Sequence, residues 1–214
     1  MLAPAGYYAI LDAAPAELGD PALLAARAAQ LLAAGPCCLQ LRAKGAGAAA
    51  FAAAARALLP QARAARVPFC VNDRLDVALA VGADAVHLGQ DDLLLSDALA
   101  VRARAGRPDL AIGFSTHNRA QALAAAGGGA DYIGLGPVYG TGSKLNPDPV
   151  LGLLALAEIC REVKIPIVAI GGITLDRAPA VASAGASAAA VIAAVTTAAD
   201  PTAAGRRIAA AFGR

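Results

Sequence analysis

Short apolar segments alternate about eight times with longer alanine-rich segments along this chain of 214 residues. Gly, Pro, Asn or Asp bounds most of the apolar segments, and Leu, Phe and Val recur within the longer ones. Several short segments are apolar throughout, which is typical of parallel strands that are covered on both faces. The pattern predicts eight β-then-α units, and therefore an α/β fold of the (β/α)8 TIM-barrel class, in a single domain that spans residues 1–214.

The boundaries of the expected elements follow from the same alternation. The expected strands are 7–11, 37–41, 69–71, 85–88, 111–114, 132–135, 167–170 and 189–192. The expected helices are 21–34, 47–65, 74–82, 96–105, 118–126, 150–162, 175–184 and 200–212. An open doubly wound sheet alternates in the same way, so the count alone leaves that fold open. The first strand lacks a G-x-G-x-x-G turn after it, which argues against a dinucleotide-binding fold.

Charge and composition exclude several classes of partner. The 18 basic and 16 acidic residues give a net charge of +2, so there is no basic excess for nucleic acid. Alanine supplies much of the mean hydropathy of +0.57 and adds little insertion energy, so we expect no membrane span, even at the uncharged residues 178–199. The N-terminus shows no signal-peptide pattern, which predicts a cytoplasmic protein. The four cysteines lack C-x-x-C spacing and are expected to be reduced. The oligomeric state stays open, a homo-oligomer included.

Polar residues and glycines cluster after the expected strands, at the end where a barrel carries its active site. In chain order these residues are Gln40, Arg42, Lys44, Asn72, Asp73, His87, Gln90, Asp91, Asp92, Ser115, Thr116, His117, Thr141, Ser143, Lys144, Gly171 and Gly172. The apolar Ile192 and Ala193 follow the last strand. Polar side chains at one end only of the strands indicate a functional site there.

Two carboxylates on neighbouring strands predict a metal site. Asp73 and Asp92 follow the third and fourth strands, and Mg²⁺ needs only a few protein carboxylates besides water and phosphate oxygens. The alternative is that each aspartate caps the helix that follows it. Arg42 and Lys44 lie two residues apart and point the same way if the segment is extended, which suits a phosphate group. The alternative for these two cations is a solvated surface pair.

The last two strands predict a second site for an anion. Gly171, Gly172 and the turn after Ile192 stand where barrel enzymes bind phosphate through backbone N–H groups. Two anion sites on one face suggest two phosphorylated substrates and a synthase that joins them. His87 lies within an apolar strand and is interpreted as a hydrogen-bonded structural residue, whereas His117 is better placed, just past a strand end.

Six segments resemble the thiamine phosphate synthase family and occur in the family's order. They are Q-L-R-A-K at 40–44, V-N-D-R at 71–74, V-H-L-G-Q-D-D-L at 86–93, S-T-H at 115–117, A-D-Y-I-G-L-G-P at 130–137 and I-V-A-I-G-G-I at 167–173. The resemblance implies a barrel enzyme that joins a hydroxymethylpyrimidine diphosphate to a thiazole phosphate, or its carboxylate, and releases pyrophosphate.

The resemblance also implies roles for individual residues. Arg42, Lys44, Ser115 and Lys144 would be catalytic, and Asp73 and Asp92 would bind Mg²⁺. Substrates would be bound by Gln40, Arg42, Lys44, Asn72, Ser115, Thr141, Ser143, Lys144, Gly172, Ile192 and Ala193.

The chain departs from the family pattern at three positions, Gly140, Ser143 and Ala193. The family's Pro-Thr-x-Thr-Lys segment is G-T-G-S-K at 140–144, and a family serine after the last strand is Ala193. Two alternatives remain: a thiazole tautomerase of the same fold, in which His117 would act, and a non-catalytic sensor of a phosphorylated ligand. Asn72, Asp73, Gln90 and Asp92 argue against the tautomerase.

Overall fold

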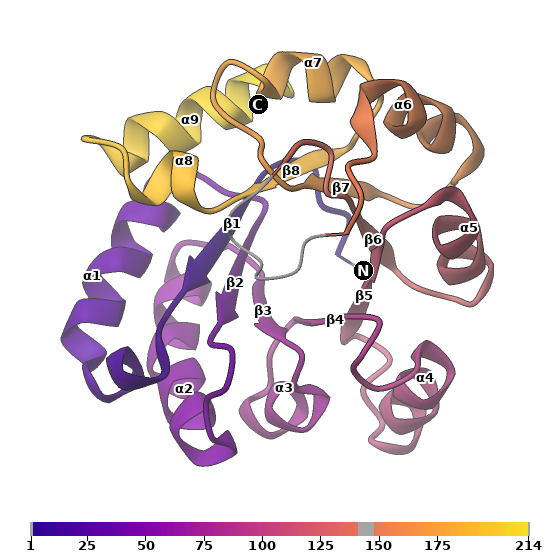
Figure 1. Ribbon diagram of the computed structural model, residues 1–214. Coiled ribbons are helices and arrows are strands. Elements are labelled where there is room, and N and C mark those ends of the chain that lie inside the picture. The colour runs from indigo at the N-terminus through magenta and orange to yellow at the C-terminus, as the bar shows by residue number, and fades with distance from the viewer. Residues whose placement is uncertain (1, 141–147, 214) are drawn as a thin grey trace.

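The computed structural model describes residues 2–140 and 148–213. Eight parallel strands form a closed barrel in which each strand pairs with its neighbours in sequence, and helices surround it (Figure 1). The closure is made by β1 and β8, where Gly6 pairs with Ala188 and Ala9 pairs with Val191. This pairing confirms the predicted TIM barrel and excludes the open doubly wound sheet.

The strands and helices have the following bounds. The strands are β1 (Gly6–Asp12), β2 (Cys38–Arg42), β3 (Phe69–Asn72), β4 (Ala85–Leu88), β5 (Ala111–Thr116), β6 (Tyr132–Leu135), β7 (Ile167–Ile170) and β8 (Ala188–Val191). The helices are η1 (Pro15–Gly19), α1 (Pro21–Leu32), α2 (Ala48–Ala64), α3 (Leu75–Val81), α4 (Leu95–Arg104), α5 (Arg119–Gly127), α6 (Gly152–Glu162), α7 (Ala178–Ser183), α8 (Ala193–Thr196) and α9 (Pro201–Ala211).

All sixteen predicted elements are present, and their ends differ from the predictions by a few residues. The last strand lies one residue earlier than expected, because Ala188 is paired and Ile192 already precedes α8. The short η1 and α8 helices were not predicted, since neither is long enough to show a helical period. Aspartate or asparagine begins three of the long helices: Asp20, Asn118 and Asp200 each accept a backbone N–H of the first turn.

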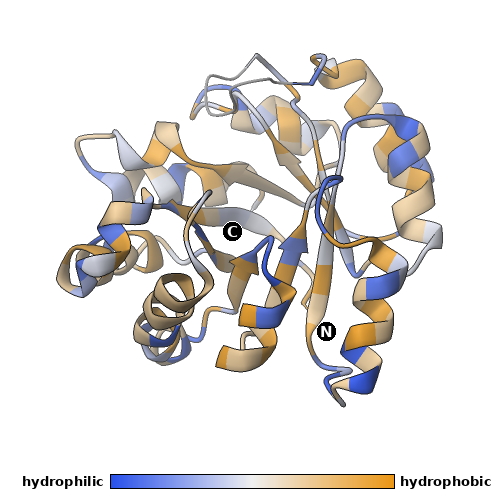
Figure 2. Ribbon diagram, turned by 60° about the horizontal axis from the view of Figure 1, so that its bottom comes forward, coloured by the Kyte–Doolittle hydropathy of each residue, from blue (hydrophilic) through white to orange (hydrophobic). Residues whose placement is uncertain are grey.

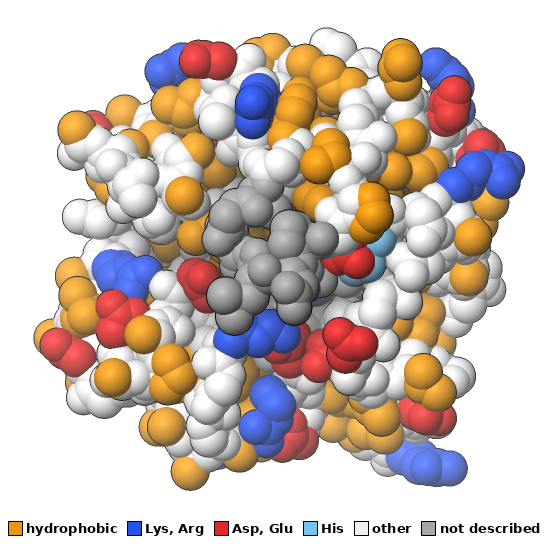
Figure 3. Space-filling model, viewed as in Figure 1, with side chains coloured by type: hydrophobic (Ala, Val, Ile, Leu, Met, Phe, Trp, Pro, Cys, Tyr) orange, Lys and Arg blue, Asp and Glu red, His pale blue; other side chains and the backbone are white. Residues whose placement is uncertain are grey.

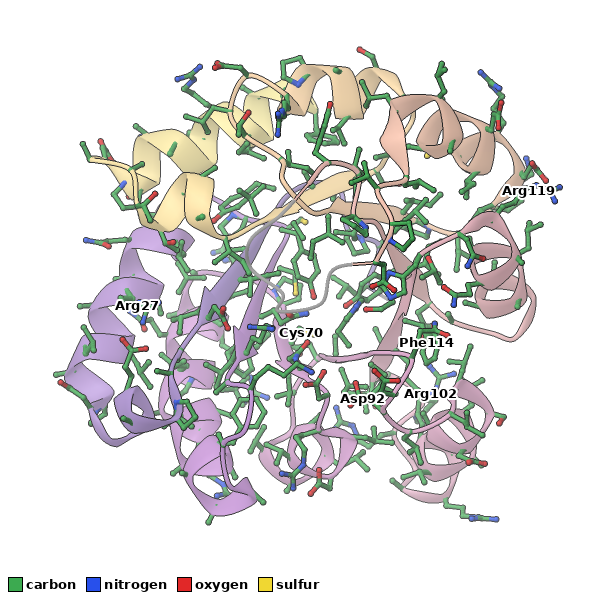
Figure 4. All side chains as sticks on the ribbon, in the orientation of Figure 1. Arg27, Cys70, Asp92, Arg102, Phe114 and Arg119 are labelled. Atoms are coloured by element: carbon green, nitrogen blue, oxygen red, sulfur yellow. The ribbon has the colours of Figure 1, made fainter. Side chains whose placement is uncertain are left out.

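Side chains alternate along each strand between two apolar environments. One set fills the barrel interior and consists of Tyr8, Ile10, Cys38, Cys70, Ala85, Ala111, Tyr132, Val168, Ala188 and Ala190. The other set, which includes Tyr7, Phe69 and Ile112, packs against the surrounding helices. Figure 4 shows Cys70 among the interior side chains and Phe114 between the strands and the outer helices. Hydrophilic residues concentrate in the helices and loops around the largely hydrophobic strands (Figure 2).

Two expectations from composition can be compared with the structure. Cys38, Cys70 and Cys160 are free thiols, as predicted. Within the described part of the chain, no helix is both long and apolar enough to cross a bilayer.

Tyr7 provides a test of the packing between the barrel and its helices. Its side chain is 1% exposed, and its hydroxyl has no hydrogen-bond partner within residues 2–140 and 148–213. Because a buried, unpaired hydroxyl costs free energy, Tyr7→Phe should raise the free energy of unfolding by about 1 kcal/mol in urea titrations. The matched control is Tyr8→Phe on the same strand, which removes a paired hydroxyl and should lower stability. Equal effects of the two substitutions would contradict the assignment.

Candidate active site

One cavity of about 720 Å³ lies at the carboxyl ends of the strands. Every residue with a predicted catalytic, binding or metal role in the described part of the chain lines it: Gln40, Arg42, Lys44, Asn72, Asp73, Asp92, Ser115, Gly172, Ile192 and Ala193. Thr116 from the strand-end cluster does not, because it is buried and its hydroxyl donates to the carbonyl of Gly134 at 2.9 Å. Figure 3 shows acidic and basic side chains and a histidine gathered around the centre of this face. The predicted residues Thr141, Ser143 and Lys144 lie outside the described residues. The structure therefore brings the remaining candidates together.

Two cations extend from β2 toward the cavity, and each pairs with a carboxylate. Arg42 Nη1 lies 2.5 Å from Oδ1 of Asp12, the residue opposite it in the β1–β2 register. Lys44 forms an ion pair with Asp73, although its side chain is 57% exposed. The alternative of a solvated surface pair is wrong for Arg42, whose side chain is 22% exposed and held in place by Asp12.

Asp73 has an unusual backbone conformation directly after β3. Its φ of 62° lies in the left-handed region, which few residues other than glycine adopt, although aspartate and asparagine tolerate it. Its N–H donates to the carbonyl of His87 at 2.8 Å, which ties the turn to β4. Helix α3 begins with Arg74 as its N-cap, without a side-chain cap. Asp73 therefore is not a helix cap, and its carboxylate is available to the cavity.

Asp92 folds back onto the turn after β4. Its Oδ2 accepts the N–H of Gly89 at 2.7 Å, and α4 begins only after Leu94, so the predicted helix-capping alternative is wrong for Asp92 as well. Figure 4 shows Asp92 in the loop between β4 and α4. Burial and the adjacent Asp73 carboxylate, which is within hydrogen-bonding reach, raise the pKa of Asp92.

The two aspartates fit Mg²⁺ as a pair of oxygen ligands. No cluster of three or more His, Cys, Asp or Glu side chains suited to a metal is found within residues 2–140 and 148–213. Mg²⁺ does not need such a cluster, because it retains waters and takes phosphate oxygens. Burial first, and then repulsion from the Asp73 carboxylate, raise the pKa of Asp92, and a divalent cation held between the two carboxylates would offset that repulsion.

Five polar side chains form a continuous hydrogen-bonded network across the barrel interior below the cavity. Gln40 Nε2 donates to the hydroxyl of Tyr8 at 3.0 Å, and this hydroxyl lies 3.0 Å from that of Tyr132. The Tyr132 hydroxyl lies 3.2 Å from Nδ1 of His87, whose Nε2 lies 2.9 Å from Oγ of Ser115. We call these five residues the interior network. It joins Gln40 on β2 to Ser115 on β5.

Two glycines make room for the middle of the interior network. A Cβ atom at Gly113 would overlap the Tyr132 ring and Nδ1 of His87, and one at Gly134 would lie 3.0 Å from Cε1 of His87. The imidazole therefore occupies a slot beside β5 and β6 that larger residues would close. His87 is a hydrogen-bonded interior residue, as predicted, but it also lines the cavity.

The opposite side of the cavity is built from backbone. Gly171 and Gly172 have φ of 96° and 62°, and a Cβ on Gly171 would lie 2.5 Å from Cβ of Pro137, so only glycine fits there. Ile192 precedes α8 and Ala193 begins it, next to this turn in the cavity wall. Arg177 also lines the cavity and holds the turn by donating to the carbonyl of Gly172 at 2.8 Å.

His117, the residue on which the tautomerase alternative depends, is anchored beside the cavity. Its Nδ1 lies 2.6 Å from the carbonyl of Gly136 and 3.5 Å from Oδ2 of Asp148. Its backbone N–H donates to Gln121 Oε1 at 2.8 Å.

Several site residues were missed at the level of sequence. Asp12 ends β1 and could have been found by the rule applied to the other strands, since it follows an apolar segment. Tyr8 and Tyr132 lie inside apolar strands and resemble ordinary core residues. Arg177 lies beyond the turn after β7, and no sequence signal separates it from other surface arginines.

The pKa of His87 leads to a testable pH dependence. Desolvation inside the barrel lowers its pKa to about 4, and the Asp92 carboxylate offsets this only in part. Between about pH 6.5 and pH 4 the unfolded histidine is protonated and the folded one is not. Stability should therefore fall across this window as pH decreases, by about 3 kcal/mol in all.

The measurement compares urea unfolding of the wild type and His87→Gln at several pH values between 4 and 6.5. The variant should lose stability less steeply as pH decreases. His117→Gln removes the other histidine of the chain, keeps His87, and should retain the steep decline. Parallel curves for the wild type and His87→Gln would contradict the assignment.

Comparison with known proteins agrees with this geometry. The family model "Thiamine monophosphate synthase" matches residues 7–195. The thiamine-phosphate synthase of Anaeromyxobacter dehalogenans is 46% identical over 207 residues, which cover 97% of this chain and 87% of that protein. The enzyme of the same name from Chlorobium phaeovibrioides is 49% identical over 160 residues, or 75% of each chain.

Solved structures show the same relationship. The thiamine phosphate pyrophosphorylase from Pyrococcus furiosus superposes with a TM-score of 0.82 and 34% identity, over 97% of this chain and 95% of that one. A 3-hexulose-6-phosphate synthase, at 18% identity and a TM-score of 0.66, shares the fold alone. The chain therefore belongs to the thiamine monophosphate synthase family and is a transferase of thiamine biosynthesis.

Proposed function

We propose that the cavity joins 4-amino-2-methyl-5-hydroxymethylpyrimidine diphosphate to 4-methyl-5-(2-phosphoethyl)thiazole, and that it releases thiamine phosphate and pyrophosphate. One observation carries the proposal: a single cavity combines cations and paired carboxylates on one side with a glycine turn and a helix start on the other. The first side suits a diphosphate with its metal, and the second suits a monophosphate. The same cavity has room for both substrates.

Asp73 and Asp92 would hold Mg²⁺ against the diphosphate. When bound, the metal ion supplies positive charge to the diphosphate oxygens as the bond to carbon breaks. Arg42 and Lys44 would add two further cations to the same oxygens. Asp12 fixes Arg42 before any ligand arrives, so little reorganisation would be needed at the moment of reaction. Lys44 would exchange its ion pair with Asp73 for the diphosphate.

Asn72, together with Gln40 and Ser115 at the two ends of the interior network, would bind the pyrimidine substrate. Gln40 and Asn72 are buried, at 3% and 7% exposure, so their polar groups favour a ligand that can pair with them. On the other side, Gly172, Ile192 and Ala193 would bind the thiazole phosphate through backbone N–H groups. Thr141, Ser143 and Lys144 remain proposed contacts from the sequence, with Lys144 on the departing pyrophosphate.

The reaction requires no side-chain nucleophile. The electron-rich aminopyrimidine stabilises a methylene cation, so the carbon–oxygen bond to the diphosphate can break before the thiazole nitrogen attacks. Ser115 and His87 form a close pair, but the pKa of about 4 makes His87 a weak base at neutral pH, which argues against serine activation. The protein's contribution is electrostatic stabilisation of the leaving group, where one preorganised contact is worth about 3 kcal/mol.

A two-substrate assay tests the proposed function. The purified protein is mixed with both phosphorylated substrates and Mg²⁺, and pyrophosphate and thiamine phosphate are quantified together. Both products should form in equal amounts, and only when both substrates are present. In parallel the protein is incubated with a thiazole tautomer alone. Conversion of that tautomer without pyrophosphate release would indicate a tautomerase, and ligand binding without either reaction would indicate a sensor.

Removing either metal-site carboxylate should abolish most of the activity without unfolding the protein. Asp73→Asn or Asp92→Asn should lower the rate of pyrophosphate release roughly 100-fold at a fixed Mg²⁺ concentration, equivalent to about 3 kcal/mol. Asparagine tolerates the left-handed backbone of position 73, so the turn is kept. The control is Asp97→Asn on the exposed face of α4, which makes the same charge change away from the cavity and should leave the rate unchanged.

A further inference from the structure

The interior network contains three residues to which the proposed mechanism gives no role. We propose that these three, the two tyrosines and His87, are positioning residues that couple the hydrogen-bond roles of Gln40 and Ser115 at the ligand ring. When one end offers the ligand a donor, the other end must offer an acceptor. This inference rests on the proposed function, in which Gln40 and Ser115 contact the aminopyrimidine.

The coupling follows from the number of protons in the network. Each hydroxyl has one proton, and a neutral imidazole has one N–H. If Gln40 donates to Tyr8, the protons run in order through Tyr132 to Nδ1 of His87, whose Nε2–H then donates to Ser115. The Ser115 hydroxyl can then donate its proton to a ligand in the cavity, and Gln40 Oε1 can accept a hydrogen bond from that ligand. If every hydrogen bond in the network ran in the opposite direction, Ser115 would become the acceptor toward the ligand and Gln40 the donor.

Burial makes independent rotation of the hydroxyls costly. Tyr8 is 2% exposed and Tyr132 is fully buried, so a hydroxyl proton turned out of the network would lose a strong acceptor. Burial also raises the pKa of both tyrosines well above its usual range, which keeps the phenols protonated. The slot beside Gly113 and Gly134 holds the imidazole against Tyr132 and Ser115.

Cys70 sets the direction of the network in the free protein. Its thiol donates to the carbonyl of Val71 at 3.7 Å, which leaves the sulfur as an acceptor for Gln40 Nε2 at 3.8 Å. The same sulfur lies 3.8 Å from the Tyr132 hydroxyl, but Nδ1 of His87 at 3.2 Å is the nearer and stronger acceptor for the Tyr132 proton. Both N–H groups of the Gln40 amide are then directed inward, to Tyr8 and to Cys70. The resting site accordingly presents an acceptor from Gln40 and a donor from Ser115.

A neutral 4-aminopyrimidine matches this pair of ends, because it carries an amino donor as well as ring-nitrogen acceptors. An analogue in which a methoxy group replaces the amino group has acceptors only. Such an analogue can pair only with the end of the network that donates. In either direction of the network, the end that accepts would then lack a partner in the buried site. The network would therefore select for the amino group, and breaking it should relax that selection.

The first test is the tautomer of His87, which needs no substrate. In ¹⁵N NMR spectra of the full-length free protein at pH 7, wild-type His87 should be a single neutral tautomer with its proton on Nε2. Tyr132→Phe removes the donor to Nδ1 and should give a mixture of tautomers. Tyr7→Phe, which removes a hydroxyl outside the network, should leave the spectrum unchanged, and His117→Gln assigns the second histidine. An unchanged His87 spectrum in Tyr132→Phe would overturn the proposal.

The second test measures specificity by calorimetric titration with the pyrimidine diphosphate and its methoxy analogue, in the presence of Mg²⁺. Tyr132→Phe should reduce the preference for the amino compound by about tenfold, through loss of a paired buried group. Tyr8→Phe separates Gln40 from the rest of the network, so it should reduce the preference and, because the direction set at Gln40 no longer reaches Tyr132, should also give a mixture of His87 tautomers. Tyr7→Phe should retain the full preference.

The outcomes distinguish this inference from the proposed function. Failure of the two-substrate assay would remove the proposed reaction, whereas the NMR result would still report whether Tyr132 sets the tautomer of His87. Normal thiamine phosphate formation together with an undiminished amino preference in both tyrosine variants would overturn the positioning role alone. If Tyr132→Phe fails to fold, Tyr8→Phe decides the question, because its preference must then fall.

Discussion

Closure of the barrel between β1 and β8 is the constraint on which the rest of the structure depends. Because all eight strands are parallel and joined edge to edge, their carboxyl ends meet at one rim and every second side chain points inward. An interior of this size must be filled by those side chains. Alanine and cysteine dominate the inward positions of β3, β4 and β8, which leaves space for two tyrosines and an imidazole. The small inward residues and the polar interior network therefore both follow from the need to fill the barrel interior.

The inward side chains become more polar along the barrel axis toward the cavity. This order keeps the groups that cost most to desolvate closest to water. On β2 the inward side chains run from Cys38 through Gln40 to Arg42, and on β5 from Ala111 through Gly113 to Ser115. Along these two strands, neutral polar groups occupy the middle, where they can hydrogen-bond one another, and the charged group, Arg42, lies at the rim, where water and ligands reach it. This gradient would let the site bind the proposed phosphorylated substrates without burying an unpaired charge beneath them.

Local periodicity in the sequence was sufficient to predict the order of the elements and the cluster at the strand ends, whereas closure of the barrel was established only by the pairing of β1 with β8. The sequence was not sufficient for features that depend on register between distant strands. Tyr8 and Tyr132 are 124 residues apart and are adjacent only once β1 and β6 are placed in the closed barrel. The left-handed backbone of Asp73 likewise follows from its bond to β4 and has no local signal. Helix capping and metal binding predict the same sequence pattern at Asp92, and only the structure, in which its carboxylate accepts from Gly89, excludes capping.

In the proposed reaction the two sides of the cavity would bind their anions by different means, and the chemistry gives a reason for the difference. On the diphosphate side negative charge accumulates as the leaving group departs, so full charges that are already in position stabilise the transition state more than the ground state. Arg42, fixed by Asp12, is such a charge. On the thiazole side the phosphate carries the same charge throughout. Backbone N–H groups at Gly172 and Ala193 can hold it there without a strong field that would compete for the departing diphosphate. The lack of a hydroxyl at Ala193 is compatible with this difference, because the thiazole side would have to bind the phosphate but not to stabilise a developing charge.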